Sequence, residues 1–136
     1  PLVRGDRGGA ASAGERVVTA PCPAVSVVVP LFNEENSVRE LVDRLSRTLG
    51  ALGGTFEIVL VNDGSRDGTA AILEELAASN PAIRVLTLTR NFGQSAALCC
   101  GLFESRGLSV ITMDGDLQNP PEEVPRLLAA LAPGVD

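Results

Sequence analysis

The stretch Val25-Ser-Val-Val-Val29, closed by Pro30, decides how the chain folds, because it opens a pattern that the following residues repeat. Its β-branched residues predict a short buried strand. Apolar residues then recur at the spacing of a helix that ends near Gly50, Gly53 and Gly54: Val38, Leu41, Val42, Leu45 and Leu49. The first unit of the fold is therefore a strand, a loop and a helix.

The same unit recurs along the rest of the chain. Further apolar runs predict three more strands: Phe56–Val61, Ile83–Leu88 and Leu108–Met113. Between them we expect one helix with Ile72, Leu73 and Leu76 on its inner face and an end at Asn80-Pro81, and another from about Gln94 to Ser105. Strands alternating with helices predict right-handed βαβ units. The expected fold class is α/β, a parallel, Rossmann-like sheet with helices on both faces.

Two details of the helices can also be predicted. Asn119 is expected to cap the last helix, with Pro120 at its first position and Glu122 completing a capping box. In the helix before it, the adjacent Cys99 and Cys100 are expected to pack as small buried residues. The three cysteines of the chain form no metal-ligand pattern, which favours a reducing compartment.

Composition divides the chain into two parts. Residues 1–24 are rich in Gly, Ala, Arg and Pro without periodicity and predict a flexible tail, while residues 25–136 predict one domain. The chain begins with Pro and stops at Asp136, so we expect this domain to be truncated at its C-terminal end. The sequence predicts neither an export signal nor a segment long enough to span a bilayer.

The charge and the missing residue types exclude several functions. The net charge of −6 argues against a nucleic-acid partner, which requires a basic face. All 11 basic residues are Arg. Without His, a Ser-His-Asp triad, a Cys-His pair and an imidazole metal site are excluded, and without Lys, a Walker-type phosphate loop and a Schiff base are excluded too. Catalysis must therefore depend on carboxylates, Arg, amides and a metal.

Polar residues follow all four predicted strands, at the point where each strand ends. They are Asn33 and Glu34; Asn62, Asp63 and Ser65; Arg90 and Asn91; and Asp114, Asp116 and Gln118. If the strand order is third, second, first, fourth, the ligand crevice lies between the first and fourth strands. Asp114 and Asp116 flank Gly115, whose backbone can approach a ligand closely. Such hard oxygen ligands suit Mg²⁺ or Mn²⁺, which substrate phosphates would also bind. The alternative is that Asp114 and Asp116 belong to a solvated turn without a metal.

Four segments make the chain resemble a known family. They are Val29-Pro-Leu-Phe-Asn-Glu-Glu35, Val61-Asn-Asp-Gly-Ser-Arg-Asp-Gly-Thr69, Arg90-Asn-Phe-Gly93 and Asp114-Gly-Asp-Leu-Gln-Asn-Pro-Pro-Glu122. Together they resemble the nucleotide-binding half of a family 2 glycosyltransferase with the GT-A fold, over roughly residues 25–131. The last two segments resemble the branch that loads sugars onto polyprenyl phosphates, which includes dolichol-phosphate mannosyltransferases.

The resemblance implies a set of donor-binding residues. Glu34 would accept hydrogen bonds from the ribose or base, with a solvated carboxylate at the helix entry as the alternative. Asp63 would accept from a ring N–H of the base, with a structural Asx-turn as the alternative. Pro30, Asn33 and Ser65 complete the expected substrate-binding set, although Ser65 also suits the start of the next helix.

The resemblance also implies a metal site with Mg²⁺ or Mn²⁺ as cofactor. Asp116 and Gln118 would be the ligands, and Asp114 would support the nucleotide side of the site, so that Asp114 and Asp116 form the expected catalytic pair. For Gln118, an amide that merely follows a turn is the alternative. Arg90 would neutralise diphosphate charge, with a surface salt bridge as an equal alternative.

The implied reaction is inverting transfer of a sugar from a nucleotide-diphosphate sugar to a polyprenyl (dolichol-type) phosphate, assisted by the metal. The acceptor phosphate is already largely ionised near neutral pH, so it demands less of a general base than an alcohol would. Acceptor-side residues and membrane segments are expected outside this chain, which places the protein at the cytoplasmic side of a membrane. The sugar, the base and the oligomeric state stay open.

Two alternatives remain at this point. A non-catalytic fragment would bind the nucleotide without transferring sugar. A dinucleotide-dependent oxidoreductase is the weaker alternative, because Pro30-Leu-Phe-Asn33 stands where a Gly-x-Gly-x-x-Gly loop would follow the first strand.

Overall fold

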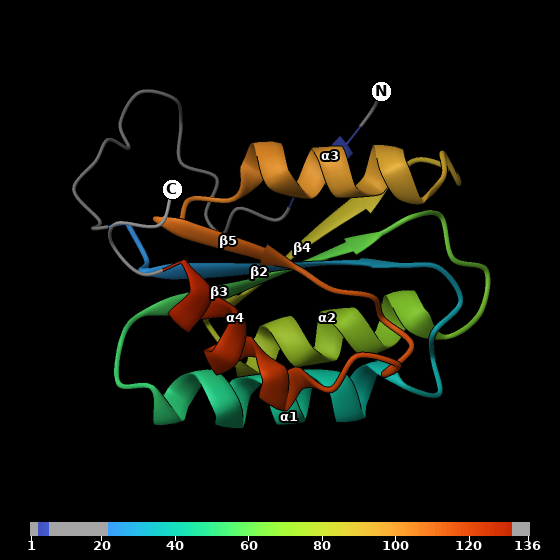
Figure 1. Ribbon diagram of the computed structural model, residues 1–136. Helices are drawn as coiled ribbons and strands as arrows, with labels where there is room; N and C mark the ends of the chain where they lie inside the picture. The colour runs from blue at the N-terminus through green and yellow to red at the C-terminus, as the bar shows by residue number, and fades with distance from the viewer. Residues whose placement is uncertain (1–2, 6–21, 132–136) are drawn as a thin grey trace.

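The computed structural model describes residues 3–5 and 22–131 and contains a central sheet with helices on both faces (Figure 1). The strand order is β1-β4-β3-β2-β5. The strands span Val3–Gly5 (β1), Val25–Leu31 (β2), Phe56–Asn62 (β3), Ile83–Leu88 (β4) and Ser109–Thr112 (β5). Strands β2 to β5 pair in parallel, which confirms the α/β class and the predicted order of these four strands.

The helices lie on the two faces of the sheet as a right-handed parallel topology requires. They span Val38–Ala51 (α1), Thr69–Ser79 (α2), Gln94–Glu104 (α3), Pro121–Glu123 (η1, a 3₁₀ turn) and Val124–Ala130 (α4). In Figure 1, α3 lies above the sheet, and α1, α2 and α4 lie below it. Helices α1 and α2 lie below the sheet, whereas α3 lies above it and leads to β5, which pairs with β2 on the side opposite β3. Strands β2 and β5 therefore flank the topological switch point.

Strand β2 is buried on both faces, which explains its nearly continuous apolar sequence. Val27, Val29 and Leu31 pack in the core beneath the sheet together with α1. Val28 belongs to the opposite core with Ala97 of α3. The apolar run that opens the domain therefore supplies both cores from one strand.

Pro30 does not end β2, contrary to our prediction, because its missing N–H lies where no partner strand is present. Met113 N donates to Val28 O (3.0 Å), so Val28 turns its backbone groups toward β5. Pro30, two residues later, faces the same side, beyond the end of β5 at Thr112. A proline at such a position removes no ladder hydrogen bond, and β2 continues to Leu31.

Strand β1 lies in the part of the chain for which we predicted a flexible tail. It runs antiparallel to β4, with Val3 opposite Leu88 and Gly5 opposite Leu86. A strand of three residues has no periodicity that sequence reasoning can detect, and its pairing depends on β4 already being in place. The tail prediction for residues 6–21 falls outside the residues that the structure describes.

The predicted start of the last helix is wrong. Pro120 is extended (φ −63°, ψ 132°), because a residue that precedes another proline is biased away from the helical region. A 3₁₀ turn follows, and α4 begins only at Val124 without a side-chain cap. Glu122 does not complete a capping box; it pairs with Arg44 of α1 (Nη2 to Oε1, 2.6 Å). That contact lowers the pKa of Glu122 to about 2.

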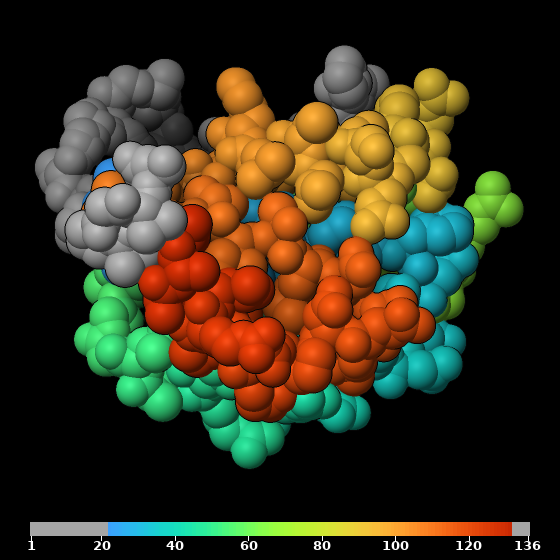
Figure 2. Space-filling model, viewed as in Figure 1, coloured from blue at the N-terminus to red at the C-terminus, as the bar shows by residue number. Residues whose placement is uncertain are grey.

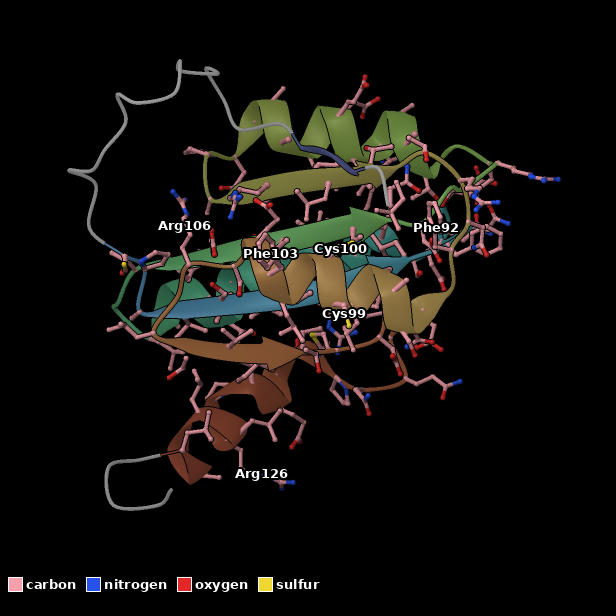
Figure 3. The ribbon with its side chains drawn as sticks, turned by 90° about the horizontal axis from the view of Figure 1, so that it is seen from above. Phe92, Cys99, Cys100, Phe103, Arg106 and Arg126 are labelled. Carbon is pink, nitrogen blue, oxygen red and sulfur yellow. The ribbon has the colours of Figure 1, made fainter. Side chains whose placement is uncertain are left out.

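The prediction that Cys99 is buried is also wrong. Cys99 is exposed on α3, and Cys100 is intermediate (Figure 3). The small residues that let α3 approach the sheet are Ala97 and Gly101, since a Cβ on Gly101 would lie 2.4 Å from Val28 Cγ1. Phe103, on the outer side of the same helix, is 86% exposed.

Among the described residues, no helix has the length and apolar character needed to cross a membrane; α1, with 14 residues, is the longest of them.

Candidate functional site

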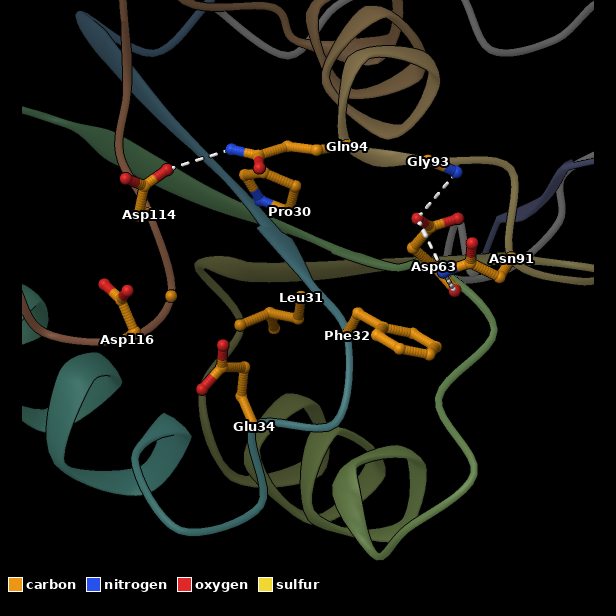
Figure 4. A pocket seen from close by; sticks show the side chains of 11 residues that line it. Pro30, Leu31, Phe32, Glu34, Asp63, Asn91, Gly93, Gln94, Asp114 and Asp116 are labelled. Carbon is orange, nitrogen blue, oxygen red and sulfur yellow. Dashed lines mark hydrogen bonds between the residues drawn. The ribbon is translucent and has the colours of Figure 1, made fainter.

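A cavity of about 400 Å³ opens at the carboxyl ends of β2, β3 and β5. It is lined by Pro30, Leu31, Phe32, Glu34, Asp63, Asn91, Gly93, Gln94, Asp114, Gly115 and Asp116 (Figure 4). In Figure 2, blue atoms of β2 and its following loop are visible in a hollow between α3 and the segment after β5. The structure thus brings five predicted site residues to one cavity: Pro30, Glu34, Asp63, Asp114 and Asp116.

Asp114 and Asp116 contribute two carboxylates from the segment that follows β5. Asp114 Oδ1 accepts a hydrogen bond from Gln94 Nε2 (3.0 Å), and Asp116 Oδ1 accepts one from Gln118 N (3.1 Å). No salt bridge among the described residues involves either of them. With Glu34 on the same cavity, the site concentrates negative charge, and the described residues that line it include no Arg or Lys to balance that charge.

The intervening Gly115 is required by packing. A Cβ at this position would lie 2.3 Å from Leu31 Cδ2 and 3.3 Å from Pro30 O, so only glycine allows the loop to lie against β2. The left-handed residue of this loop is Leu117 (φ 65°). Residues other than glycine rarely adopt this backbone conformation, and the sequence contained no signal for it.

The donor set of this cavity fits a divalent metal that is shared with a phosphate ligand. Among the described residues, no cluster of three or more His, Cys, Asp and Glu could hold a metal by itself. Mg²⁺ and similar hard cations are commonly bound through one or two carboxylates, with waters and substrate phosphates filling the other positions. Gln118 does not line the cavity and contacts Asp116 through its backbone N–H, so its role as a ligand stays a prediction.

Ser37, which sequence reasoning missed, connects two loops of the cavity. Its hydroxyl lies 3.0 Å from Glu34 Oε1 and 2.9 Å from Gly115 O, and its single proton is shared between these two acceptors. Ser37 also occupies the position before α1. A serine before a helix is ordinarily a cap, so the sequence offered no signal for a contact across 78 positions.

Asp63 holds the loop between β4 and α3. The residue is 3% exposed, and its carboxylate accepts hydrogen bonds from Phe92 N (2.8 Å), Gly93 N (3.0 Å) and Asn91 Nδ2 (3.2 Å). The turn-closing role that we considered for Asp63 belongs to its neighbour, since Asn62 Oδ1 accepts from Ser65 N (3.0 Å). Asp63 also lines the cavity, where it could reach a ligand. Its contact with a nucleotide base stays a prediction.

Asn33 and Ser65 join the loops that follow β2 and β3. Asn33 N donates to Ser65 Oγ (2.9 Å), and Asn33 Oδ1 accepts from Arg66 N (2.8 Å). Asn33 has a left-handed backbone (φ 56°), which asparagine tolerates better than most residues. Neither side chain lines the cavity of Asp114 and Asp116, so their predicted contact with substrate is untested.

Arg90 lies on a second cavity, of about 390 Å³, between the ends of β3 and β4. Ser65, Arg66 and Asn91 also line this cavity, and Asn91 lines the first one as well. The Arg90 guanidinium carbon lies 4.6 Å from the centroid of the Phe92 ring. The structure therefore does not bring Arg90 beside the acidic residues, and its predicted contact with a diphosphate stays a prediction.

The chain is similar in sequence to transferases whose names include undecaprenyl phosphate. An undecaprenyl-phosphate 4-deoxy-4-formamido-L-arabinose transferase of Pseudomonas paraeruginosa is 50% identical over 117 residues, which cover 85% of this chain and 34% of the relative. The transferase of the same name from Pseudomonas fluorescens is 48% identical over 118 residues, with the same two coverages. The chain thus spans about a third of the length of these relatives.

Solved structures with a similar fold are glycosyltransferases. A mannosyltransferase from Pyrobaculum calidifontis, in complex with GDP-Man and Mn²⁺, superposes with a TM-score of 0.70 at 26% identity, covering 84% of this chain and 34% of that one. Glucosyl-3-phosphoglycerate synthase from Mycobacterium tuberculosis, with Mn²⁺, UDP and phosphoglyceric acid, gives 0.65 at 29% identity, covering 82% and 40%.

A family model described as glycosyl transferase family 2 matches residues 26–136, which include the first cavity and all of the parallel strands except Val25 at the start of β2. This match confirms the resemblance and removes the oxidoreductase alternative. By its sequence, its fold and its relatives, the chain belongs to glycosyl transferase family 2.

Proposed function

We propose that this chain is the donor-binding part of a glycosyltransferase that moves a sugar from a nucleotide-activated donor to a polyprenyl phosphate with inversion. The observation that carries the proposal is the convergence of Glu34, Asp63, Asp114 and Asp116 from three strand ends on one cavity. Relatives that are half identical carry the name of an undecaprenyl-phosphate transferase. A structural neighbour binds GDP-Man together with Mn²⁺, and another binds UDP-GlcNAc.

In this proposal the acidic cavity would bind the donor together with a divalent metal. A nucleoside diphosphate is itself an anion, and the carboxylates of Asp114 and Asp116 would repel it in the absence of a cation. Asp114 and Asp116 would hold Mg²⁺ or Mn²⁺, which offsets the charge on the departing nucleoside diphosphate when bound. Glu34 and Asp63, which line the same cavity, would accept hydrogen bonds from the ribose and base.

The acceptor completes the proposed reaction. An oxygen of the polyprenyl phosphate attacks the anomeric carbon from the face opposite the diphosphate, and the bond from that carbon to the diphosphate oxygen breaks. The leaving group is the nucleoside diphosphate, and the configuration at carbon inverts. We propose that the residues that contact the acceptor, and segments that hold the protein at the cytoplasmic side of a membrane, lie in the two thirds of the relatives' length that this chain does not span.

Calorimetric titration tests the donor site. UDP and GDP are titrated into the chain with Mn²⁺ and with EDTA, and we expect saturable binding of at least one nucleotide only with Mn²⁺. Asp116→Asn should weaken this binding by about tenfold or more, as expected for one lost charge-assisted contact. Asp43→Asn is the matched control, because Asp43 lies on α1 with a side chain that is 62% exposed and pairs with Arg47.

Three results would contradict the proposal: no binding of either nucleotide, equal binding in EDTA, or an equal loss in the Asp43→Asn control. Transfer of labelled sugar from donor to undecaprenyl phosphate, assayed with the full-length protein, separates an enzyme from a chain that only binds the donor. Binding without transfer would favour the second of these.

A further inference from the structure

The second cavity, between the ends of β3 and β4, has no role in the function proposed above. Ser65, Arg66, Thr87, Thr89, Arg90 and Asn91 contribute polar groups to its wall, and its volume is about 390 Å³. Asn91 lines both cavities, so the two lie next to each other. No Asp or Glu is among the described residues that line the second cavity, which distinguishes it from its acidic neighbour.

The arginines of this cavity differ from the other arginines whose side chains the structure describes. Six arginines whose side chains the structure describes pair with carboxylates within 4 Å: Arg39, Arg44, Arg47, Arg84, Arg106 and Arg126. Arg66 and Arg90 have no such pair among the described residues, and both line this cavity. In a chain with a net charge of −6, two uncompensated cations at one hollow indicate an anionic ligand.

The surroundings hold both residues in place. Arg66 N donates to Asn33 Oδ1 (2.8 Å), which fixes the backbone beneath its side chain. The guanidinium of Arg90 lies 4.6 Å from the Phe92 ring centroid, and the backbone N–H of Phe92 donates to the buried Asp63. The carboxylate of Asp63 accepts hydrogen bonds from amide groups of residues 91–93 and forms no salt bridge with either arginine.

We propose that this second cavity binds a phosphate group through Arg66 and Arg90, without a metal ion. Guanidinium groups present several donors to phosphate oxygens, and the hydroxyls of Ser65, Thr87 and Thr89 add further donors. The phosphate belongs either to a separate phosphorylated small molecule or to the donor nucleotide reaching past Asn91. Only the second source depends on the function proposed above.

Pyrophosphate is the probe. Titrated into the chain in EDTA at low ionic strength, it should bind saturably, and Arg66→Gln and Arg90→Gln should each weaken binding by about tenfold. Arg39→Gln is the control, because it removes the same charge from an exposed surface outside the cavity, where Arg39 pairs with Glu75. It should leave the affinity for pyrophosphate unchanged. In NMR spectra the amides of Thr87 and Thr89 should shift with pyrophosphate and serve as a check that the variants are folded.

The proposal is overturned if pyrophosphate does not saturate the wild-type chain, or if Arg39→Gln weakens binding as much as the other two variants. Competition separates the two sources. If UDP or GDP with Mn²⁺ displaces pyrophosphate, the phosphate site is an extension of the donor site; if both bind together, the ligand is a separate molecule. Asp116→Asn should leave pyrophosphate binding in EDTA unchanged, so a failure of the donor site is distinguishable from a failure of this one.

Discussion

Glu57 and Asp116 lie at opposite ends of the same sheet, and their surroundings differ in what they offer a carboxylate. Glu57, at the amino end of β3, is 2% exposed. It accepts hydrogen bonds from Ser26 Oγ (2.6 Å), Arg106 N (2.7 Å) and Arg84 Nη1 (3.1 Å). Asp116, at the carboxyl end, accepts one from Gln118 N, and no arginine among the described residues pairs with it.

At the amino end, the polar and charged groups of Ser26, Glu57, Arg84 and Arg106 pair with one another, and we call this group the closed cluster. Burial of Glu57 opposes its ionisation, but the hydrogen bonds from Ser26 and Arg106 and the charge of Arg84 outweigh it, and the pKa of Glu57 falls below 4.5. Arg84 also donates to Glu104 O (2.8 Å), and Gly107 N donates to Ser26 Oγ (2.8 Å). These contacts fasten the α3–β5 connection, where Figure 3 labels Arg106, to the amino ends of β2 and β3.

The comparison teaches how to distinguish a structural polar cluster from a binding site. At the amino end, protein donors satisfy the buried carboxylate, so no ligand is required. At the carboxyl end, Glu34, Asp114 and Asp116 share a cavity, and the described residues that line it do not balance their charge. We call these three residues the open cluster. Internal compensation predicts a large effect of mutation on stability, whereas missing compensation predicts an effect on binding.

The largest effect should come from breaking the closed cluster. Arg84→Met keeps the side-chain volume but leaves Glu57 buried without its principal cation, and should lower the free energy of unfolding by about 3 kcal/mol. Arg39→Met, which breaks an exposed pair with Glu75, should cost less than about 1 kcal/mol. Urea denaturation measures both, and an equal loss in the two variants would remove the distinction between the clusters.

The open cluster should respond to ligand. With nucleotide and Mn²⁺ at 100 times the dissociation constant, the wild-type chain should gain about 2.7 kcal/mol of stability by mass action. Asp114→Asn and Asp116→Asn should lose most of that gain while unfolding no more easily than the wild type in EDTA. Thermal unfolding with and without ligand measures this, and a variant that is unstable in EDTA would assign the aspartates a structural role.

Acid should weaken the closed cluster. Because the folded-state pKa of Glu57 is lowered from 4.5, its contribution to stability is complete above that pH and is lost as the pH falls through the folded-state value. The difference in unfolding free energy between wild type and Glu57→Gln should therefore be largest at neutral pH and shrink below about pH 4.5. Glu74→Gln, at an exposed position of α2, should show no such trend. A difference independent of pH would contradict the assignment.

The smallest effect is expected at Ser37, which positions the open cluster. Ser37→Ala removes the hydroxyl between Glu34 Oε1 and Gly115 O and should weaken Mn²⁺-dependent nucleotide binding by about threefold, with less than about 1 kcal/mol of lost stability. Ser79→Ala, whose hydroxyl donates to Leu76 O at the end of α2, is the control. Unchanged affinity in Ser37→Ala would show that the loops are positioned without it.

Much of the fold was predictable because local pattern and topology agree. The strands at Phe56–Asn62 and Ile83–Leu88 coincide with apolar runs, and their parallel pairing follows from the intervening helices. The errors occur where a neighbour overrides a local rule. Pro30 stays in β2 because β5 has already ended, and Cys99 is exposed because Gly101 takes the place against the sheet.

The sequence by itself determined the order of strands and helices, and with it the edge of the sheet at which the polar loops gather. Periodicity is a local property, and the handedness of βαβ units converts it into topology. The tertiary structure alone decided which polar residues share a cavity: Arg90 lies on the second cavity, Asp63 holds residues 91–93, and Ser37 reaches Gly115. Such contacts depend on how loops distant in sequence lie against one another, which no local pattern records.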